Sequence, residues 1–329
     1  MSISEDQRYL QMQQWLKGIF AGQQLTLTSA SSDASFRRYF RVNVANDSWI
    51  VMDAPPDHEN IEPFIRVGKL LASHDLPVPV IFRQNLQHGF LLLSDLGNTS
   101  FLSVLNQDSV QRLYKQAIDC IVQMQMISKP AGLSDYDSTL LGNELALLDQ
   151  WFLNRHLGLD KPDFIDDLYV FLIGEAQQQP QAFVHRDYHS RNLMLQSDGT
   201  PGIIDFQDAV WGPVTYDLVS LLRDVYIQWS PSLVMDFLSY YRQQAIKHHI
   251  FDESITMPQL QRWFDLIGLQ RHLKILGIFC RLNYRDNKSN YLNDLPLTLN
   301  YVYEVCALYP ELTNLMNYLQ QPAIKDRIL

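Results

Sequence analysis

The sequence predicts an α+β fold of two lobes: a small β-rich N-terminal lobe and a larger, mainly helical C-terminal lobe with one embedded hairpin. Strand-like stretches concentrate between residues 25 and 93, and apolar residues at helical spacing follow from residue 107 onward. With 329 residues, 47% of them hydrophobic, the chain is long enough for two such lobes. We place the boundary near residue 95, so that the lobes comprise residues 1–95 and 96–329.

The N-terminal lobe begins with a helix and continues mainly as strands. Residues 5–20 carry apolar side chains among glutamines and charged residues, which predicts an amphipathic helix. Stretches rich in β-branched, aromatic or leucine residues predict strands at 25–28, 39–44, 49–52 and 90–93. Pro55 and Pro56 end the first strand region, and a second helix is predicted over 61–73.

The C-terminal lobe is predicted to be helical with one exception. Between residues 107 and 128, apolar side chains recur at 110, 113, 114, 117, 118, 121 and 122, as on the core-facing side of a helix. Two short apolar pieces, Leu193–Leu195 and Gly202–Ile204, are separated by the turn sequence Ser197–Pro201. That pattern predicts a small hairpin among the helices.

Charge and cysteine content narrow the class of protein. A net charge of −10 argues against a nucleic-acid partner, because phosphate contacts need clustered Lys and Arg. Three widely spaced cysteines, Cys120, Cys280 and Cys306, favour buried, reduced thiols over disulfides or a zinc site. The N-terminus lacks a signal-peptide pattern, and no apolar run of about 18 residues occurs. We therefore expect a cytoplasmic monomer with no membrane partner.

One short segment carries the strongest chemical signal. His185-Arg-Asp187-Tyr-His-Ser-Arg-Asn192 precedes the predicted hairpin, and Asp205-Phe follows it. Phosphoryl transfer needs an Asp that orients a hydroxyl and accepts its proton, together with an Asn and a second Asp that hold Mg²⁺. A hairpin between Asn192 and Asp205 would return both side chains to the same end.

At these residues the chain resembles the protein-kinase-like superfamily, and within it the aminoglycoside phosphotransferase family. The resemblance implies that Asp187 is the catalytic base and that Asn192 and Asp205 bind magnesium. It implies that ATP binds the lobe of residues 1–95, with the hinge Leu92–Leu96 holding adenine through its backbone, at Leu93, Ser94 and Leu96. Residues 96–329 would then form the catalytic and substrate lobe.

Two further residues are predicted to support the catalytic segment. We expect His185 to pack and hydrogen-bond beneath the loop rather than to react. Asp217 begins an apolar helical run, and we expect it to cap that helix and tether the loop. Only 12 residues separate Asp217 from Asp205, where protein kinases use a longer segment to bind a polypeptide. The short connection favours a small-molecule acceptor.

The chain departs from the kinase pattern in its phosphate-binding region. Residues 31–38 occupy the place of the glycine-rich loop, so Ser32 and Ser35 become the expected phosphate contacts. The third strand, Trp49–Asp53, carries no lysine. A cation could come from Arg37, Arg38 or Arg41, with Arg37 and Arg41 on one face and Arg38, our predicted contact, on the other. The acidic partner of that cation could be Glu59 or Glu62.

Four local strings suggest the acceptor. Met52–Pro56, Asp205–Ala209, Gly212–Asp224 and Arg281–Lys288 resemble the bacterial kinases that phosphorylate the anomeric hydroxyl of N-acetylmuramate and N-acetylglucosamine in peptidoglycan recycling. Predicted sugar contacts are Asp208, Glu144, Arg281, Asp286 and Trp211. Arg281 or Arg285 could hold the lactyl carboxylate of N-acetylmuramate.

Two other functions stay open at this point. A choline- or aminoglycoside-type kinase would need an acidic or aromatic pocket for a cation. A catalytically silent, nucleotide-binding adaptor fits the absent lysine and glycine loop, but not the presence of Asp187, Asn192 and Asp205.

Overall fold

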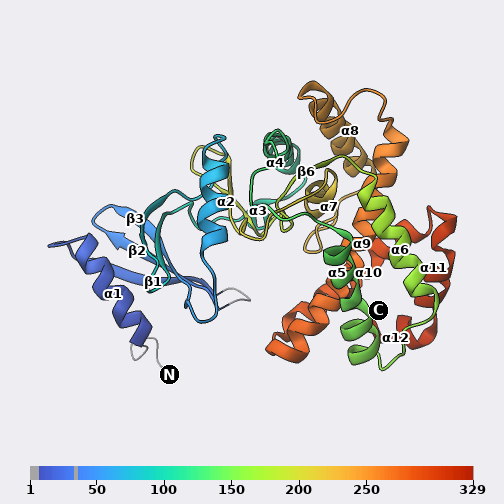
Figure 1. Cartoon of the computed structure of the whole chain (residues 1–329), viewed down its shortest axis with the longest axis horizontal. Coiled ribbons are helices and arrows are strands. Elements are labelled where there is room, and N and C mark those ends of the chain that lie inside the picture. Colours follow the sequence, from blue (N-terminus) through green and yellow to red (C-terminus); the bar gives the residue numbers. More distant parts are fainter. Residues whose placement is uncertain (1–6, 33–35, 329) are drawn as a thin grey trace. The chain divides into compact units, whose positions relative to one another are not determined.

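Residues 7–32 and 36–328 are described by the computed structural model, in which the chain divides into two compact units (Figure 1). The first comprises Met1–Thr99 with Met194–Asp208, and the second comprises Ser100–Leu193 with Ala209–Leu329. A boundary near residue 95 leaves Met194–Asp208 in the C-terminal lobe, whereas this segment packs with the first unit. The assignment of nucleotide and substrate to separate lobes stays a prediction.

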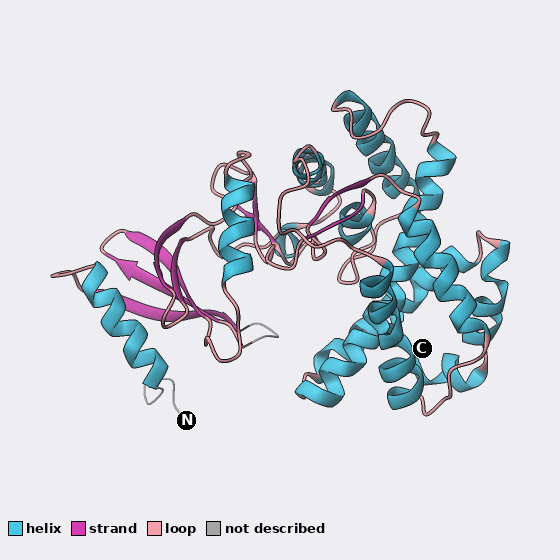
Figure 2. Cartoon of the chain, viewed as in Figure 1, coloured by secondary structure: helices cyan, strands magenta, loops and turns pink. Residues whose placement is uncertain are grey.

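An antiparallel five-stranded sheet forms the first unit (Figure 2). Its order is β1 (Leu25–Ser32), β2 (Arg38–Val44), β3 (Asp47–Asp53), β5 (Phe90–Ser94) and β4 (Ile81–Asn85). The helices are α1 (Gln7–Ile19) and α2 (Glu62–Ala72). These elements confirm the predicted helices and strands, and add β4. Its alternation is weak, because most of its side chains are exposed.

The two faces of this sheet have different chemistry. Met12 and Leu16 of α1 pack on one face, against Phe40, Val42, Val51 and Phe90. Alternation along β2 places Arg38 on that same face and Arg41 on the opposite one. The predicted split of the arginines between faces therefore holds for β2.

The predicted hairpin is present as β7 (Leu193–Leu195) paired with β8 (Pro201–Ile203). Gly199 takes a positive φ of 83° in the turn between them, a conformation that glycine adopts without strain. Leu195 N donates to Thr99 O at 2.7 Å, and Ile203 N donates to Pro77 O at 2.8 Å. These bonds attach the hairpin to the first unit.

Helices make up most of the second unit, as predicted. They are α3 (Phe101–Val104), α4 (Val110–Gln125), α5 (Ser138–Leu147), α6 (Phe164–Gln177), α7 (Tyr216–Leu222), α8 (Pro231–Lys247), α9 (Met257–Asp286), α10 (Leu295–Cys306), α11 (Thr313–Leu319) and α12 (Pro322–Ile328). A π-helical segment, η2 (Leu148–His156), continues α5, and short 3₁₀ segments, η3 (Ser289–Asp294) and η4 (Pro310–Leu312), flank α10. None of the described helices is long and apolar enough to cross a membrane.

The long helix α9, orange in Figure 1, is the centre of this unit. It packs against α5, α6, α7, α10 and η2, and its residues from Trp263 to Leu276 are all buried. A small antiparallel pair, β6 (Gln181–Val184) with β9 (Val210–Pro213), lies at the start of the catalytic segment. Sequence reasoning missed this pair, because each strand is only four residues long.

Candidate active site

The catalytic segment leaves β6 and is held from below by one carboxylate. Asp217, in the first turn of α7, accepts hydrogen bonds from the backbone N–H groups of His185 (2.7 Å) and Arg186 (3.0 Å). This is the tether that the sequence predicts. The predicted cap is wrong: Thr215 is the N-cap residue of α7, and Asp217 lies inside the first turn with its carboxylate bound to the loop. Arg186 has a φ of +78°, which is strained for a residue with a side chain, so the two bonds offset the cost of that turn.

His185 lies beneath the loop, fully buried. Its Nδ1 accepts the backbone N–H of Asp187 at 3.3 Å, and its ring meets that of Tyr188 edge-on at 5.5 Å. Burial raises the pKa of Asp217 to about 6, although His185 and the two backbone donors lower it. Both residues hold the position of Asp187 without reaching its side chain through a hydrogen bond.

The far end of the segment is fixed by Asn192 and Ser190. Asn192 Nδ2 donates to Asp187 O at 3.0 Å, which turns the amide nitrogen into the loop. Ser190 donates to the buried Asp224 through its backbone N–H (2.9 Å) and its hydroxyl (2.5 Å). Sequence reasoning missed Asp224, whose only sequence signal is its place at the end of the string Gly212–Asp224.

Asp187 is partly exposed, and several basic side chains act electrostatically on its carboxylate. Burial favours its neutral form, but Lys274, His189, Arg271 and Arg186 outweigh that effect and lower its pKa below the ordinary value. Within the described part of the chain, the carboxylate makes no hydrogen bond to another side chain. It is therefore an ionised acceptor with its lone pairs unused, as a base for a substrate hydroxyl must be.

Glu144, a predicted sugar contact, ties these cations together. Its carboxylate accepts from Lys274 Nζ (3.1 Å), Gln270 Nε2 (3.3 Å), the Arg186 guanidinium and the Tyr136 hydroxyl. Lys274 Nζ also donates to Tyr216 Oη at 3.0 Å. The Glu144 side chain is only 7% exposed, and its oxygens accept these hydrogen bonds from groups inside the protein. Sequence reasoning missed Lys274 and Arg271. The signal that could have found them is the presence of two cations within the apolar run of α9.

In the first unit, the carboxylates that follow β8 lie near one arginine. Asp205, with a φ of +67°, accepts Gln207 Nε2 at 2.7 Å, and Phe206 packs on Phe64 of α2 with ring centroids 4.8 Å apart. Arg37 Nε donates to Glu59 Oε2 at 3.2 Å. Burial opposes the charge of Arg37, but Tyr39 and the carboxylates of Glu59, Asp205 and Asp208 raise its pKa.

The other two arginines have different partners. Arg38 bonds Asp53, a buried carboxylate that Arg8 of α1 also contacts at 2.5 Å. Arg41 donates to both oxygens of Asp95, at 2.5 and 2.9 Å. The structure thus brings Arg37, not Arg38, into the field of Asp205.

The hinge and the serines complete the predicted nucleotide contacts. Leu93 and Ser94 lie in β5, where both are paired with residues of the neighbouring strand β3. By contrast, neither the N–H nor the carbonyl of Leu96 has a backbone partner among the described residues. The Leu96 backbone therefore keeps hydrogen-bonding groups that no described backbone group uses. Ser32 ends β1 and its side chain is not described, and Ser35 lies outside the described residues.

The remaining predicted sugar contacts lie on other elements. Asp286, at the last turn of α9, pairs with its neighbour Arg285 at 2.8 and 3.0 Å. Arg281 is half-buried, and burial lowers its pKa. Trp211 in β9 exchanges backbone hydrogen bonds with Ser134 and Tyr136.

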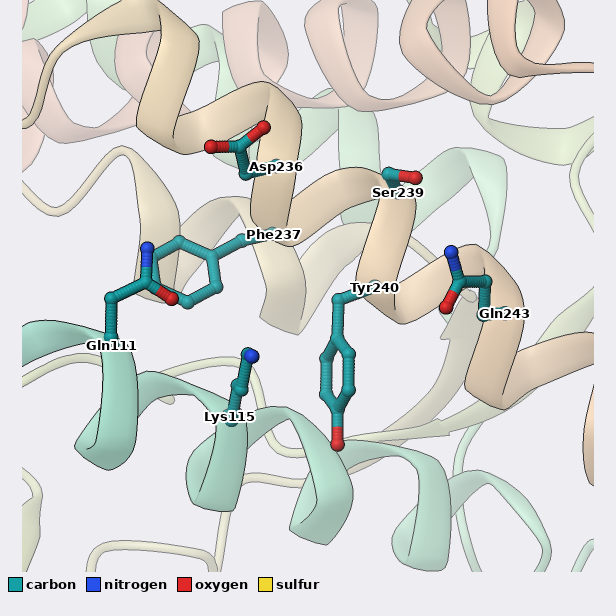
Figure 3. Close-up of a pocket in the computed structure, with 7 residues that line it drawn as sticks. All are labelled: Gln111, Lys115, Asp236, Phe237, Ser239, Tyr240 and Gln243. Atoms are coloured by element: carbon teal, nitrogen blue, oxygen red, sulfur yellow. The ribbon is translucent and has the colours of Figure 1, made fainter.

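A separate pocket of about 340 Å³ lies between α4 and α8 (Figure 3). Its lining is polar, and Lys115 sits over the ring of Tyr240 at 5.4 Å. It contains none of the residues predicted for the reaction; the lining residues are Gln111, Lys115, Asp236, Phe237, Ser239, Tyr240 and Gln243.

Comparison with known proteins gives consistent matches. Residues 26–251 match the model of the phosphotransferase enzyme family. The chain is 45% identical over 294 residues to an N-acetylmuramate/N-acetylglucosamine kinase of Pseudomonas putida, covering 88% of this chain and 86% of that protein. It is 40% identical over 334 residues to a protein of the same name from Pseudomonas aeruginosa, covering 95% and 96%.

A solved structure shares the fold. An ADP-bound aminoglycoside phosphotransferase matches with a TM-score of 0.59 at 13% identity, over 90% of this chain and 98% of that one. At this identity the likeness concerns the fold alone. It confirms the predicted fold class, with its β-rich first part and mainly helical second part.

Proposed function

Since this chain belongs to the phosphotransferase enzyme family, we propose that it transfers the γ-phosphoryl group of ATP to the anomeric hydroxyl of N-acetylmuramate or N-acetylglucosamine. The observation that carries the proposal is the ionised, partly exposed Asp187 carboxylate, which the loop fixes and which forms no hydrogen bond with any other described side chain. The acceptor class follows from the names of the relatives at 45% and 40% identity.

Asp187 acts on the acceptor. Its carboxylate accepts a hydrogen bond from the sugar hydroxyl, which orients the oxygen toward the phosphoryl group, and takes the proton as the new bond forms. An anomeric hydroxyl is more acidic than an ordinary alcohol, so an aspartate with a lowered pKa suffices as the base. The cations around Glu144 keep Asp187 ionised while this happens.

The donor side uses oxygen ligands and one cation. Asn192 and Asp205 offer an amide carbonyl and a carboxylate, the hard donors that suit Mg²⁺. When bound, the ion neutralises charge that develops on the phosphates. Arg37 takes the role of the absent strand lysine, because it pairs with Glu59 and its charge reaches Asp205. Leu96 offers its backbone to adenine.

The test is ADP release from ATP and Mg²⁺ across a panel of N-acetylmuramate, N-acetylglucosamine, glucose, choline and an aminoglycoside. We expect turnover with the two N-acetylated sugars, and a product that has lost its reducing end, as a sugar 1-phosphate must. Asp187→Asn should lower kcat by roughly 10²- to 10⁴-fold, the usual contribution of a general base.

Asp236→Asn is the matched control, because Asp236 is exposed in the pocket between α4 and α8. Its kcat should equal that of the wild type. Turnover on choline or the aminoglycoside alone would show that the acceptor is a cationic alcohol and not an amino sugar of the cell wall. ATP binding without any turnover would favour the catalytically silent, nucleotide-binding adaptor.

A further inference from the structure

We propose that Arg271 binds the carboxylate of the acceptor N-acetylmuramate beside Asp187, and so determines which amino sugars are used; this inference rests on the proposed function. Arg271 belongs to α9 and is only 3% exposed. Among the described residues it forms no ion pair and no hydrogen bond, and its Nη1 is buried without a partner.

Unpartnered polar atoms gather around Asp187. Besides Arg271 Nη1, the buried atoms without a partner among the described residues include His189 Nδ1 and Gln270 Oε1. Arg186, His189 and Arg271 all act electrostatically on Asp187, and Gln270 shares Glu144 with Arg186. Buried polar groups in folded proteins are nearly always satisfied. Donors and an acceptor left open at one place indicate a polar ligand that supplies the missing partners.

The charge at this place favours an anion. Lys274, one turn along α9 from Arg271, already has Glu144 as its partner, and Arg186 shares that carboxylate. Arg271 has no carboxylate of its own within ion-pair distance among the described residues. A buried guanidinium needs such a partner, and a carboxylate fits its planar donors better than any neutral group. N-acetylmuramate carries that carboxylate, and N-acetylglucosamine does not.

Position along α9 separates Arg271 from the arginines that the sequence suggested for this role. Arg281 is ten residues further along the helix, a rise of about 15 Å, and Arg285 is further still. One sugar ring with its substituents is shorter than that. An acceptor whose anomeric hydroxyl meets Asp187 therefore has its lactyl carboxylate near Arg271. Arg285 is also engaged with Asp286.

The experiment compares steady-state kinetics on the two sugars for wild type, Arg271→Gln, Arg271→Lys and Arg281→Gln. We expect Arg271→Gln to lower kcat/KM for N-acetylmuramate by roughly 10- to 100-fold, mainly through KM, as for loss of a charged hydrogen bond. For N-acetylglucosamine the loss should be clearly smaller, because this sugar lacks the carboxylate and loses only the effect of Arg271 on Asp187. The remaining turnover also shows that the variant folds. Arg271→Lys should recover part of the loss, because it keeps the charge.

Two controls make the result specific. Arg262→Gln, on the same helix but paired with Glu175 and Glu311, should leave both sugars unchanged. Calorimetric binding of N-acetylmuramate without ATP should weaken in Arg271→Gln alone, which excludes an effect on the transferred phosphoryl group.

Equal loss on both sugars would overturn the inference, because Arg271 would then act on Asp187 or the phosphates. Selective loss in Arg281→Gln with none in Arg271→Gln would also overturn it. A wild-type protein that uses neither sugar would instead refute the proposed function, a different outcome.

Discussion

At the scale of single residues, carboxylates decide the geometry of the active-site loop. Asp217 takes two backbone N–H groups, Asp224 takes two donors from Ser190, and Glu144 gathers the cations behind Asp187. Each is almost fully buried, so each needs its donors to offset desolvation. The strained φ of Arg186 persists because this network fixes both of its neighbours.

Asp217 gives a pH-dependent prediction. Its pKa in the folded protein is about 6, against about 3.9 for an unfolded chain. Between these values the folded state holds a proton that the unfolded state has released, so the Asp217 contribution to stability falls as pH rises. Asp217→Asn cannot titrate. The free energy of unfolding of the variant, relative to wild type, should therefore rise by about 1 kcal/mol between pH 5 and pH 7.

Urea unfolding at several pH values measures this difference. Asp108→Asn, which makes the same change at an exposed carboxylate before α4, serves as the control for the substitution itself. If the Asp217→Asn difference were flat, Asp217 would carry no raised pKa in the folded protein.

The arginines of β2 and its approach give a second prediction at this scale. Arg37→Gln should raise KM for ATP by roughly 10-fold or more, because a phosphate partner loses a charged hydrogen bond. Arg38→Gln should leave KM for ATP nearly unchanged and lower the free energy of unfolding by about 1–3 kcal/mol, because buried Asp53 loses one of its two cations. Steady-state kinetics with ATP and urea unfolding of both variants test this prediction. A raised KM for ATP in Arg38→Gln with an unchanged KM in Arg37→Gln would indicate that Arg38 is the phosphate contact.

At the scale of elements, α9 requires a glycine where it crosses the end of α5. A Cβ at Gly277 would lie 2.3 Å from the backbone C and O of Leu147, the last residue of α5 before η2. Backbone atoms cannot move aside as a flexible side chain can, so the helices would have to separate. The same crossing brings Lys274 of α9 to Glu144 of α5, because Lys274 lies one turn before Gly277 on α9.

Gly277→Ala should therefore lower the free energy of unfolding by about 3 kcal/mol or more, beyond ordinary overpacking. Gly174→Ala in α6 is the matched control, because nothing lies within 4 Å of a Cβ there. It should raise stability by about 0.5–1 kcal/mol through helix propensity. Urea unfolding of both variants measures the contrast, and similar stabilities would show that α9 and α5 can separate without cost.

At the scale of the whole molecule, two separate segments of the chain, Met1–Thr99 and Met194–Asp208, build the first unit. The strands and α2 form from local sequence, but the unit is complete only when Met194–Asp208 returns and Phe206 packs on Phe64. A side chain at Gly68 of α2 would lie 3.2 Å from the Phe206 ring, which shows how closely the returning segment fits. Asp205 is therefore positioned by α2, a helix more than 130 residues away in sequence.

Local sequence by itself determined the fold class, the catalytic segment and the hairpin that follows it. Hydrophobic periodicity and turn residues are local properties, and the pattern from His185 to Asp205 spans one short stretch of chain. For the same reason the sequence anticipated the tether at Asp217, which lies at the start of the next helix.

Only the tertiary structure decided which long-range partners each charge has. The sequence offers Arg37, Arg38 and Arg41 as candidate cations without showing their partners, and packing gives them Glu59, Asp53 and Asp95. In the sequence, Arg271 and Lys274 are two cations in an apolar helix. In the structure, Glu144 of α5 pairs with Lys274, and Arg271 has no ion-pair partner among the described residues. The energy of a buried charge depends on neighbours that are distant in sequence, so no local pattern reveals it.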